Sequence, residues 1–352
     1  MTAAAASGHG LAAGYRRFVR RRVLLLAGLL AAVLAALVAD VATGPSSFPA
    51  ARLLAGLLDP SVLGAAERVI LWDIRLPQAV IALLVGASLG VAGVELQTAL
   101  DNPMASPLTL GIQAAATFGA AVAIVFGIAV AGAGATVVVP GFAFLAAALA
   151  ALALYALSRL YGAGADTVVL FGIALLFAMN ALVALVQFVA DPDALQQVVF
   201  WTMGSLAKAT WPKVAVLLAV LALCVPASLR QAAAMTALRS GDEHARSLGV
   251  PVERLRLLVL ARASLLTAAA VAFVGAIGFV GLVGPHIARL ALGEDHRFLV
   301  PGSALAGALV LCLASIASKS LLPGIVIPVG IVTALVGVPL FMALILTRRR
   351  RR

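Results

Sequence analysis

The sequence predicts an all-α polytopic membrane protein with about ten transmembrane helices. Hydrophobic residues make up 63% of its 352 residues and charged residues only 11%, whereas ordinary globular chains carry about 25% charged residues. The apolar residues form long runs, and the basic residues gather at the ends of those runs. A soluble surface cannot be made from this mixture, so lipid is the solvent of most of the chain.

Ten apolar stretches are predicted to span the membrane, since a bilayer core needs roughly 20 apolar residues per helix and stretches with Gly or Pro can be short or tilted. They lie at 23–43, 77–100, 108–130, 138–160, 167–190, 212–229, 256–275, 277–288, 300–319 and 325–346. Residues 23–346 therefore form one transmembrane domain between basic tails at 1–22 and 347–352. None of the stretches outside the spans can bury a core of its own; the longest are 44–76, 191–211 and 230–255.

The basic residues at the two ends of the chain predict its orientation. Five arginines precede the first span and five follow the last, which by the positive-inside rule places both termini in the cytoplasm. The N-terminus also has the order of a signal peptide, but its apolar stretch is too long for one. We therefore expect a retained first span in a multi-pass protein of the cytoplasmic (inner) membrane. Six of the 25 basic residues then lie outside: Arg52, Arg68, Arg75, Lys208, Lys213 and Lys319.

The sequence lacks the residue patterns that nucleic-acid binding, metal binding and ATP hydrolysis require. The net charge of +11 comes without the interleaved aromatic residues of single-strand binders, so nucleic acid is not an expected partner. Four scattered histidines and two cysteines inside apolar runs predict no metal site, disulfide or cofactor. No G-x-x-x-x-G-K-[ST] phosphate loop is present. The chain is not expected to be an enzyme, no catalytic residue is assigned, and any ATP drive must come from another subunit.

The segment SGDEHARSLGV, residues 240–250, predicts a short helix outside the membrane. Ser240 and Glu243 have the spacing of a capping box, and Gly249 suits the C-terminal cap. Such a helix would show Ala245 and Leu248 on one side, and a short helix needs a partner against which to bury that side. The alternative is a loop that only connects two spans.

The segment DNPMASP, residues 101–107, breaks the chain between two spans. Its two prolines and its asparagine interrupt helix on both sides. Broken backbone at membrane depth is tolerated where it is buried in protein or lines a water-filled cavity. A pore constriction and an ordinary turn are both consistent with this segment.

Three ionisable residues lie where charges are costly or few. Glu95 lies inside a predicted span, where ionisable groups are candidates for function; it can face a pathway, pair with a buried arginine such as Arg262, or stay protonated. Arg75 and Lys319 are among the few outer cations, so they can meet an acidic partner or act as interface anchors.

Small residues recur through the spans. Examples are Gly86, Gly90 and Gly93 in one span and Gly302 and Gly307 in another. Glycine allows helix backbones to approach closely in lipid. We interpret these positions as close helix packing rather than ligand contacts.

Five segments between Arg75 and the C-terminal arginines carry a resemblance to a known family. They read RLPQAVIALLVGASLGVAGVELQ, DNPMASPLTLG, GDEHARSLGV, GAIGFVGLVGPHIARLALGEDHR and PVGIVTALVGVPLF. Together they resemble the FecCD-type permeases of ATP-binding-cassette (ABC) importers for iron siderophores, haem and cobalamin. The resemblance implies a type II ABC importer permease: a ten-span subunit that pairs with a second permease subunit, the same chain or a paralogue, with ABC ATPases below and a substrate-binding protein above.

The resemblance also implies roles for particular residues. The ATPase-coupling helix would comprise Gly241, Asp242, Glu243, Ala245, Arg246, Leu248 and Gly249. The cytoplasmic gate would comprise Asn102, Pro103 and Met104 with Asp166 and Thr167. The residues that dock the binding protein would be Arg75 and Lys319.

Four residues depart from the family pattern. Gln78 stands where a second Arg is usual after Pro77, and Ser315 where an Asp is usual. Lys319 replaces a usual Arg, and a Lys cannot give the bidentate fork of an Arg. Val326 stands where a Glu is common. The departures affect the expected docking residues.

The resemblance predicts the permease subunit of an ATP-driven importer, with an iron(III)-siderophore as the first cargo and haem or cobalamin as the alternative. A competing class is a secondary transporter driven by an ion gradient, with Glu95 binding the proton. A structural membrane protein is a third class. The sequence does not name the chelate.

Overall fold

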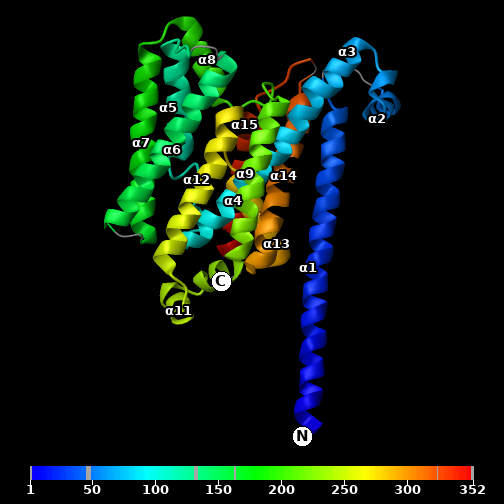
Figure 1. Cartoon of the computed structure of the whole chain (residues 1–352), viewed down its shortest axis with the longest axis vertical. Helices are drawn as coiled ribbons and strands as arrows, with labels where there is room; N and C mark the ends of the chain where they lie inside the picture. Colours follow the sequence, from blue (N-terminus) through cyan, green and yellow to red (C-terminus); the bar gives the residue numbers. More distant parts are fainter. Residues whose placement is uncertain (1, 45–48, 131–133, 162–163, 323, 350–352) are drawn as a thin grey trace.

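The structure, a computed structural model, describes residues 2–44, 49–130, 134–161, 164–322 and 324–349. These residues are mostly helical, and the β-structure among them includes one isolated bridge between Leu322 and Ile325. The helices pack side by side into one bundle (Figure 1). The all-α prediction is confirmed.

The helices follow one another in this order. They are α1 (Thr2–Ala42), α2 (Ala50–Leu58), η1 (Pro60–Val62), α3 (Ala65–Arg68), η2 (Val69–Arg75), α4 (Leu76–Ala99), α5 (Ile112–Val125), α6 (Ala135–Tyr161), α7 (Ala165–Phe188), α8 (Pro192–Thr202), α9 (Trp211–Arg230), α10 (Ala232–Leu238), α11 (Asp242–Ser247), α12 (Val252–Val274), α13 (Val280–Leu292), α14 (His296–Ser320) and α15 (Val329–Arg349).

The predicted spans correspond to ten apolar helices of the described chain. Seven are long and apolar enough to cross a membrane, and three shorter apolar segments, in α5, α13 and α15, complete the set. Beyond α1, several predicted boundaries are displaced by up to five residues, and two of the predicted starts have a clear cause in the backbone. The span placed at 108–130 begins at Ile112 because Gly111 takes a left-handed conformation and Leu108–Leu110 form a turn. The span placed at 277–288 runs from Val280 to Leu292, because residues 275–279 are not helical and Phe279 takes a left-handed conformation.

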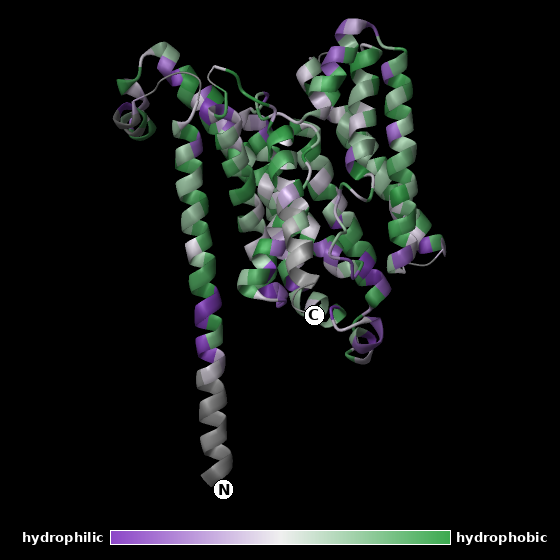
Figure 2. Cartoon of the chain, turned by 180° about the vertical axis from the view of Figure 1, so that it is seen from behind, coloured by the Kyte–Doolittle hydropathy of each residue, from purple (hydrophilic) through white to green (hydrophobic). Residues whose placement is uncertain are grey.

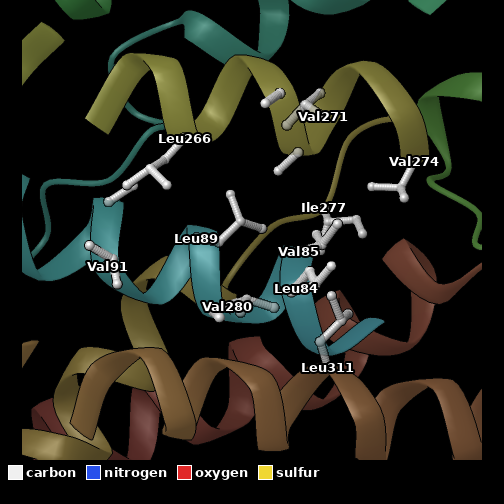
Figure 3. Close-up of a cluster of buried hydrophobic side chains, with 14 of the residues drawn as sticks. Leu84, Val85, Leu89, Val91, Leu266, Val271, Val274, Ile277, Val280 and Leu311 are labelled. Carbon is white, nitrogen blue, oxygen red and sulfur yellow. The ribbon is translucent and has the colours of Figure 1, made fainter. Parts of the chain in front are cut away.

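Helix α4 is the centre of the bundle. In its most apolar 18-residue window 89% of the residues are buried, against 17% for α1 and for α7. It packs against α14, α12 and α13, and Figure 3 shows Leu84, Val85 and Leu89 between these helices. Since α1 and α7 leave most of their apolar side chains uncovered within the chain, these faces require lipid or another subunit to cover them.

Glycine brings α4 into contact with its neighbours, as predicted. A Cβ on Gly86 would meet the backbone of Gly307, and a Cβ on Gly90 would overlap the carbonyl of Ser303, both on α14. Gly93 lies against the carbonyl of Gly281 on α13. Close contact of this kind is the usual source of helix association in lipid, where burial of apolar area brings no gain.

The chain between α12 and α13 is not helical, and its residues are buried or partly buried. Gly275 and Phe279 have positive φ values of 78° and 67°. The side-chain amide of Gln113 donates to the carbonyl of Ile277 (2.9 Å), and the backbone N–H of Ser205 donates to the carbonyl of Val274 (2.7 Å). These bonds replace the helical ones, which is the condition for broken backbone away from water.

The bundle has two ends that differ in polarity. Helix α11 and the beginning of α1 lie toward one end, which we call the α11 end, and α2 and α3 lie at the other (Figure 1). Hydrophilic residues gather on α11 and on the arginine-bearing part of α1 (Figure 2). Residues 2–22 of the predicted N-terminal tail belong to helix α1. Of the predicted C-terminal tail, Arg350 to Arg352 lie outside the described residues.

Gly90→Ala is expected to destabilise the chain even though alanine favours helix, because the new methyl group overlaps the Ser303 carbonyl. Overpacking of this kind costs about 1–3 kcal/mol. The measurement is thermal unfolding in detergent. Gly28→Ala on α1 is the matched control, because a Cβ there meets nothing within 4 Å. Equal melting temperatures for the two variants would contradict the close contact.

Candidate functional site

Helix α11 is the short helix predicted outside the spans, but it does not begin as predicted. Its N-cap is Gly241, with φ 103°, and no side chain caps the helix. The predicted capping box of Ser240 and Glu243 is therefore wrong. Ser240 lies one residue too early, because Gly241 supplies the turn into the helix. Asp242 and Glu243 still occupy the first turn, where negative charge is favourable.

The C-terminus of α11 ends as the sequence indicates. Gly249 has φ 80° and donates to the carbonyl of Arg246 (2.9 Å), while Val250 donates to that of Ala245 (3.0 Å). This pair of bonds is a Schellman motif, which needs a residue that accepts a left-handed conformation. The glycine therefore fixes where α11 stops.

The two apolar residues of α11 point in different directions, so the prediction that Ala245 and Leu248 share one side is wrong. Ala245 is fully buried, whereas Leu248 is 61% exposed. The reason is that Leu248 is the C-cap, beyond the last helical residue. Ala245 belongs to a small separate core, which we call the α11 core. It comprises Ala99, Met235, Leu238, Ala245, Val252, Leu255 and Val259.

Charged residues hold α11 against α12 and α4. The Arg256 guanidinium lies 3.0 Å from the Asp242 carboxylate, and its Nε donates to the carbonyl of Ala99 at 2.6 Å. Arg246 contacts Glu253 at 2.6 Å. That hydrogen bond raises the pKa of the Arg246 guanidinium above its ordinary value. The surface of α11 therefore carries fixed charges of both signs around the exposed Leu248.

The break at 101–107 follows directly from the end of α4. Asp101 has φ 42°, and the N–H of Asn102 donates to the carbonyl of Gln97 (3.1 Å). The Asn102 side chain then accepts from the N–H of Met104 (2.9 Å). Met104 is 52% exposed. The segment is a compact, internally bonded turn that presents Pro103 and Met104 at the α11 end of the bundle.

The start of α7 lies beside the end of α4. Asp166 is exposed and Thr167 is partly buried in the first turn of α7. The next residue, Val168, lines a small cavity together with Leu100 and Arg256. Leu100 and Val168, which adjoin the two predicted gate segments in the sequence, therefore line the same cavity.

Glu95 pairs with Arg262, which was one of the three alternatives. Its carboxylate accepts from the Arg262 Nε at 2.7 and 3.0 Å, and Ser228 also donates to it. Arg262 donates further to the side chain of Gln231 (3.0 Å). Glu95 is fully buried. The pair joins α4, α9 and α12 at one point inside the bundle.

Arg75 and Lys319 both turn inward toward the C-terminus of α1. Arg75 is 4% exposed and donates to the carbonyls of Val41 and Ala42, each at 3.1 Å. Lys319 Nζ lies 2.8 Å from the Asp40 carboxylate. In this conformation both side chains bind groups of α1. Their role in docking a binding protein therefore stays a prediction.

The other departures from the family pattern lie nearby. Ser315 donates to the Asp40 carboxylate at 2.8 Å. Ser315 has no negative charge, whereas an Asp is usual at this position. The acid that pairs with Lys319 is Asp40 on α1. Gln78 is partly buried and Val326 is exposed.

Sequence reasoning missed three buried polar residues. Asp40 lies in the first predicted span and could have been found by the rule that drew attention to Glu95. Arg256 was placed at a span boundary, where a basic residue is unremarkable. His296 is fully buried and contacts Thr98 (2.8 Å) and Thr236 (3.2 Å); no local pattern identifies such a contact.

Within the described ranges, no three His, Cys, Asp or Glu side chains gather as a metal site. What the arrangement offers instead is a membrane-embedded bundle with a buried central helix and a small helix projecting at one end. Those features define a polytopic membrane protein.

The sequence matches the FecCD transport family over residues 29–347. The chain belongs to this family, and it is a transmembrane permease subunit of an ABC importer. It is 38% identical over 317 residues to the cobalamin import system permease of Halobacterium salinarum, covering 88% of this chain and 82% of the relative. It is 34% identical over 280 residues to the hemin transport system permease of Yersinia pestis, covering 80% and 84%.

A solved structure shows the same fold. It is described as an inward-facing conformation of a metal-chelate type ABC transporter, and it matches with a TM-score of 0.80 and 30% identity over 92% of this chain and 99% of the other. The predicted type II permease architecture is confirmed.

Glu95→Gln is expected to destabilise the chain by about 3 kcal/mol or more, because it leaves Arg262 buried without its counter-charge. Changing Arg262 to Met in the same chain should recover most of the loss, since a buried pair replaced as a whole is often neutral. Thermal unfolding in detergent measures both.

The matched control is the pair of Arg52 and Glu67, whose side chains are 55% and 28% exposed, so that Glu67→Gln should cost less than about 1 kcal/mol. A Glu95→Gln variant as stable as the native chain would instead mean that Glu95 is already protonated.

Proposed function

We propose that this chain forms one half of the translocation path of an importer for a bulky metal chelate, with an iron(III)-siderophore as the first candidate cargo. The family match and the metal-chelate type structural relative support this cargo class. The relatives named for cobalamin and hemin make those two chelates the alternatives. A second permease subunit, identical or paralogous, would complete the path.

The observation that carries the ATP-driven part of the proposal is the exposed Leu248 on α11. One side of α11 is buried in its own chain through Ala245, while Leu248 stays uncovered beside fixed charges. Isolated helices this short are not stable by themselves, and here the rest of the chain holds α11 in place. An ABC ATPase subunit is the partner that this surface would bind, through Gly241, Asp242, Glu243, Arg246, Leu248 and Gly249.

The proposed orientation places the α11 end and both termini in the cytoplasm of the cell, in the inner membrane. The arginines of α1 lie toward the α11 end (Figure 2), as the positive-inside rule requires. The turn with Asn102, Pro103 and Met104, beside Asp166 and Thr167, would then be the cytoplasmic gate. A substrate-binding protein would dock at the opposite end; Arg75 and Lys319 would contribute to it if α1 releases them.

The competing secondary-transporter class is disfavoured by the pairing of Glu95. A proton-binding carboxylate has to gain and lose its proton during transport, whereas the Glu95 carboxylate is fully buried and accepts hydrogen bonds from both Arg262 and Ser228. The structural membrane protein class has no support from the family match.

Uptake into proteoliposomes tests the proposed function. Vesicles holding the permease with its ATPase and binding protein should take up a radiolabelled ferric hydroxamate siderophore only when ATP is inside. An uncoupler should leave the uptake unchanged, because no ion gradient drives it. Haemin and cobalamin are offered separately. Full uptake without the ATPase would refute the proposal, and uptake of cobalamin or haemin alone would reassign the cargo.

Leu248→Asp is expected to weaken binding of the ATPase about tenfold or more, because it puts a charge in the centre of the proposed contact. Co-purification of the two subunits from detergent measures the effect. Leu58→Asp is the matched control, since Leu58 is 90% exposed at the opposite end and should leave binding unchanged. Equal binding by both variants would remove α11 from the interface.

A further inference from the structure

One arginine side chain connects α11 to the end of the helix that leads into the 101–107 turn. Arg256, on α12, is 4% exposed. Its Nε donates to the carbonyl of Ala99, the last residue of α4, at 2.6 Å. Its Nη2 donates to the two carboxylate oxygens of Asp242, the first residue of α11, at 3.0 and 3.3 Å. A single guanidinium therefore binds two different helices at once.

Both groups that this side chain contacts, the Ala99 carbonyl and the Asp242 carboxylate, favour an arginine at position 256. The Ala99 carbonyl is among the last four of α4, which have no partner within the helix, and a positive charge is favourable there. Asp242 is an acid in the first turn of α11. Only a planar fork with several N–H groups reaches both acceptors in fixed directions; the ammonium of a lysine is a point charge.

Apolar packing reinforces the same connection. The α11 core holds Ala99 of α4 together with Ala245 of α11 and Val252 of α12, and it is separate from the main core of the bundle. Closely packed interiors transmit displacement because they deform little. A push on α11 is therefore carried to Ala99 by contact as well as by Arg256.

Ala99 lies next to the turn that the proposed function assigns to the gate. Leu100 caps α4, and Asp101 and Asn102 follow. Arg256 also lines the cavity of about 10 Å³ whose walls include Leu100 and Val168. Arg256 therefore shares a cavity wall with Leu100 and Val168, which adjoin the two candidate gate segments in the sequence.

A second ionic contact is weaker. Arg239 reaches Asp101 at 3.0 Å, but the Asp101 side chain is 74% exposed, and exposed pairs contribute little. The buried Arg256 bridge is the stronger of these two ionic connections.

We propose that Arg256 is the positioning residue that transmits displacement of α11 to the gate turn at 101–107. This rests on the proposed function, in which an ATPase moves α11. The bridge makes the end of α4 move with α11, so that ATP binding to the ATPase changes the position of Asn102 and Met104. Without the bridge the ATPase still binds α11 and hydrolyses ATP, but the gate turn responds much less, because only the apolar contact with Ala99 remains.

The test uses the permease–ATPase complex in lipid nanodiscs, with Met104→Cys as a reporter and the buried Cys224 and Cys312 changed to Ala. The rate of labelling by a membrane-impermeant maleimide is measured with and without ATP and vanadate. With Arg256 in place the rate should change about fivefold or more, the scale of an allosteric coupling. With Arg256→Gln the change should fall below about twofold, while co-purified ATPase and ATP hydrolysis are retained.

Two further variants separate positioning from simple charge or packing effects. Arg256→Lys keeps the positive charge without the fork, so it should not restore the response; full restoration would overturn the bridge. Arg289→Gln is the matched control, because Arg289 is similarly buried and contacts Glu294 at the same end of the bundle. It should respond like the native chain.

Other outcomes are also decisive. A native response in Arg256→Gln overturns this proposal alone, and loss of ATPase binding in that variant makes Arg256 merely structural. If Arg256→Gln does not assemble, Asp242→Ala removes both acceptor oxygens of the α11 half of the bridge, and an unchanged response in the assembled complex overturns the proposal. A chain with native Arg256 that binds no ATPase refutes the proposed function itself.

Discussion

The close approach of α4 to α13 and α14 is the contact on which the rest of the structure depends. Gly86, Gly90 and Gly93 remove the side chains that would hold the three backbones apart. In lipid this contact has to come from van der Waals packing, because moving apolar side chains from lipid into protein gains nothing. Once α4 is enclosed, its polar residues can be satisfied only by other parts of the same chain.

The buried ionic pairs follow from that enclosure. Glu95 on α4 is surrounded by protein and meets Arg262, and Asp40 on α1 meets Lys319. Removing a charge from water costs several kcal/mol even after relaxation, so each pair is acceptable only when both members arrive together. The pairs therefore fix the relative positions of helices that apolar packing alone would leave free to slide.

The sequence predicted the elements better than the contacts between them. Apolar length and charge placement were sufficient for ten spans, and Gly249 was sufficient for the end of α11. The start of α5 was missed because a left-handed glycine shortens the helix without interrupting the apolar run. Pairing with Arg262, 167 residues away, was one of three alternatives that the sequence left open for Glu95, and Asp40, 279 residues away, was not predicted as the partner of Lys319. Local pattern shows that a buried charge needs a partner, and only the fold shows which one.

The two ends of the bundle use arginine in the same way for different purposes. At one end Arg75 caps the C-terminus of α1 through two carbonyls, and at the other Arg256 caps that of α4 through one. In both cases the guanidinium satisfies backbone acceptors that a helix end leaves open. The difference is the second contact of Arg256. Because Asp242 is on a helix that projects from the bundle with Leu248 uncovered, the α4 cap is also the junction at which an external force would enter the membrane domain.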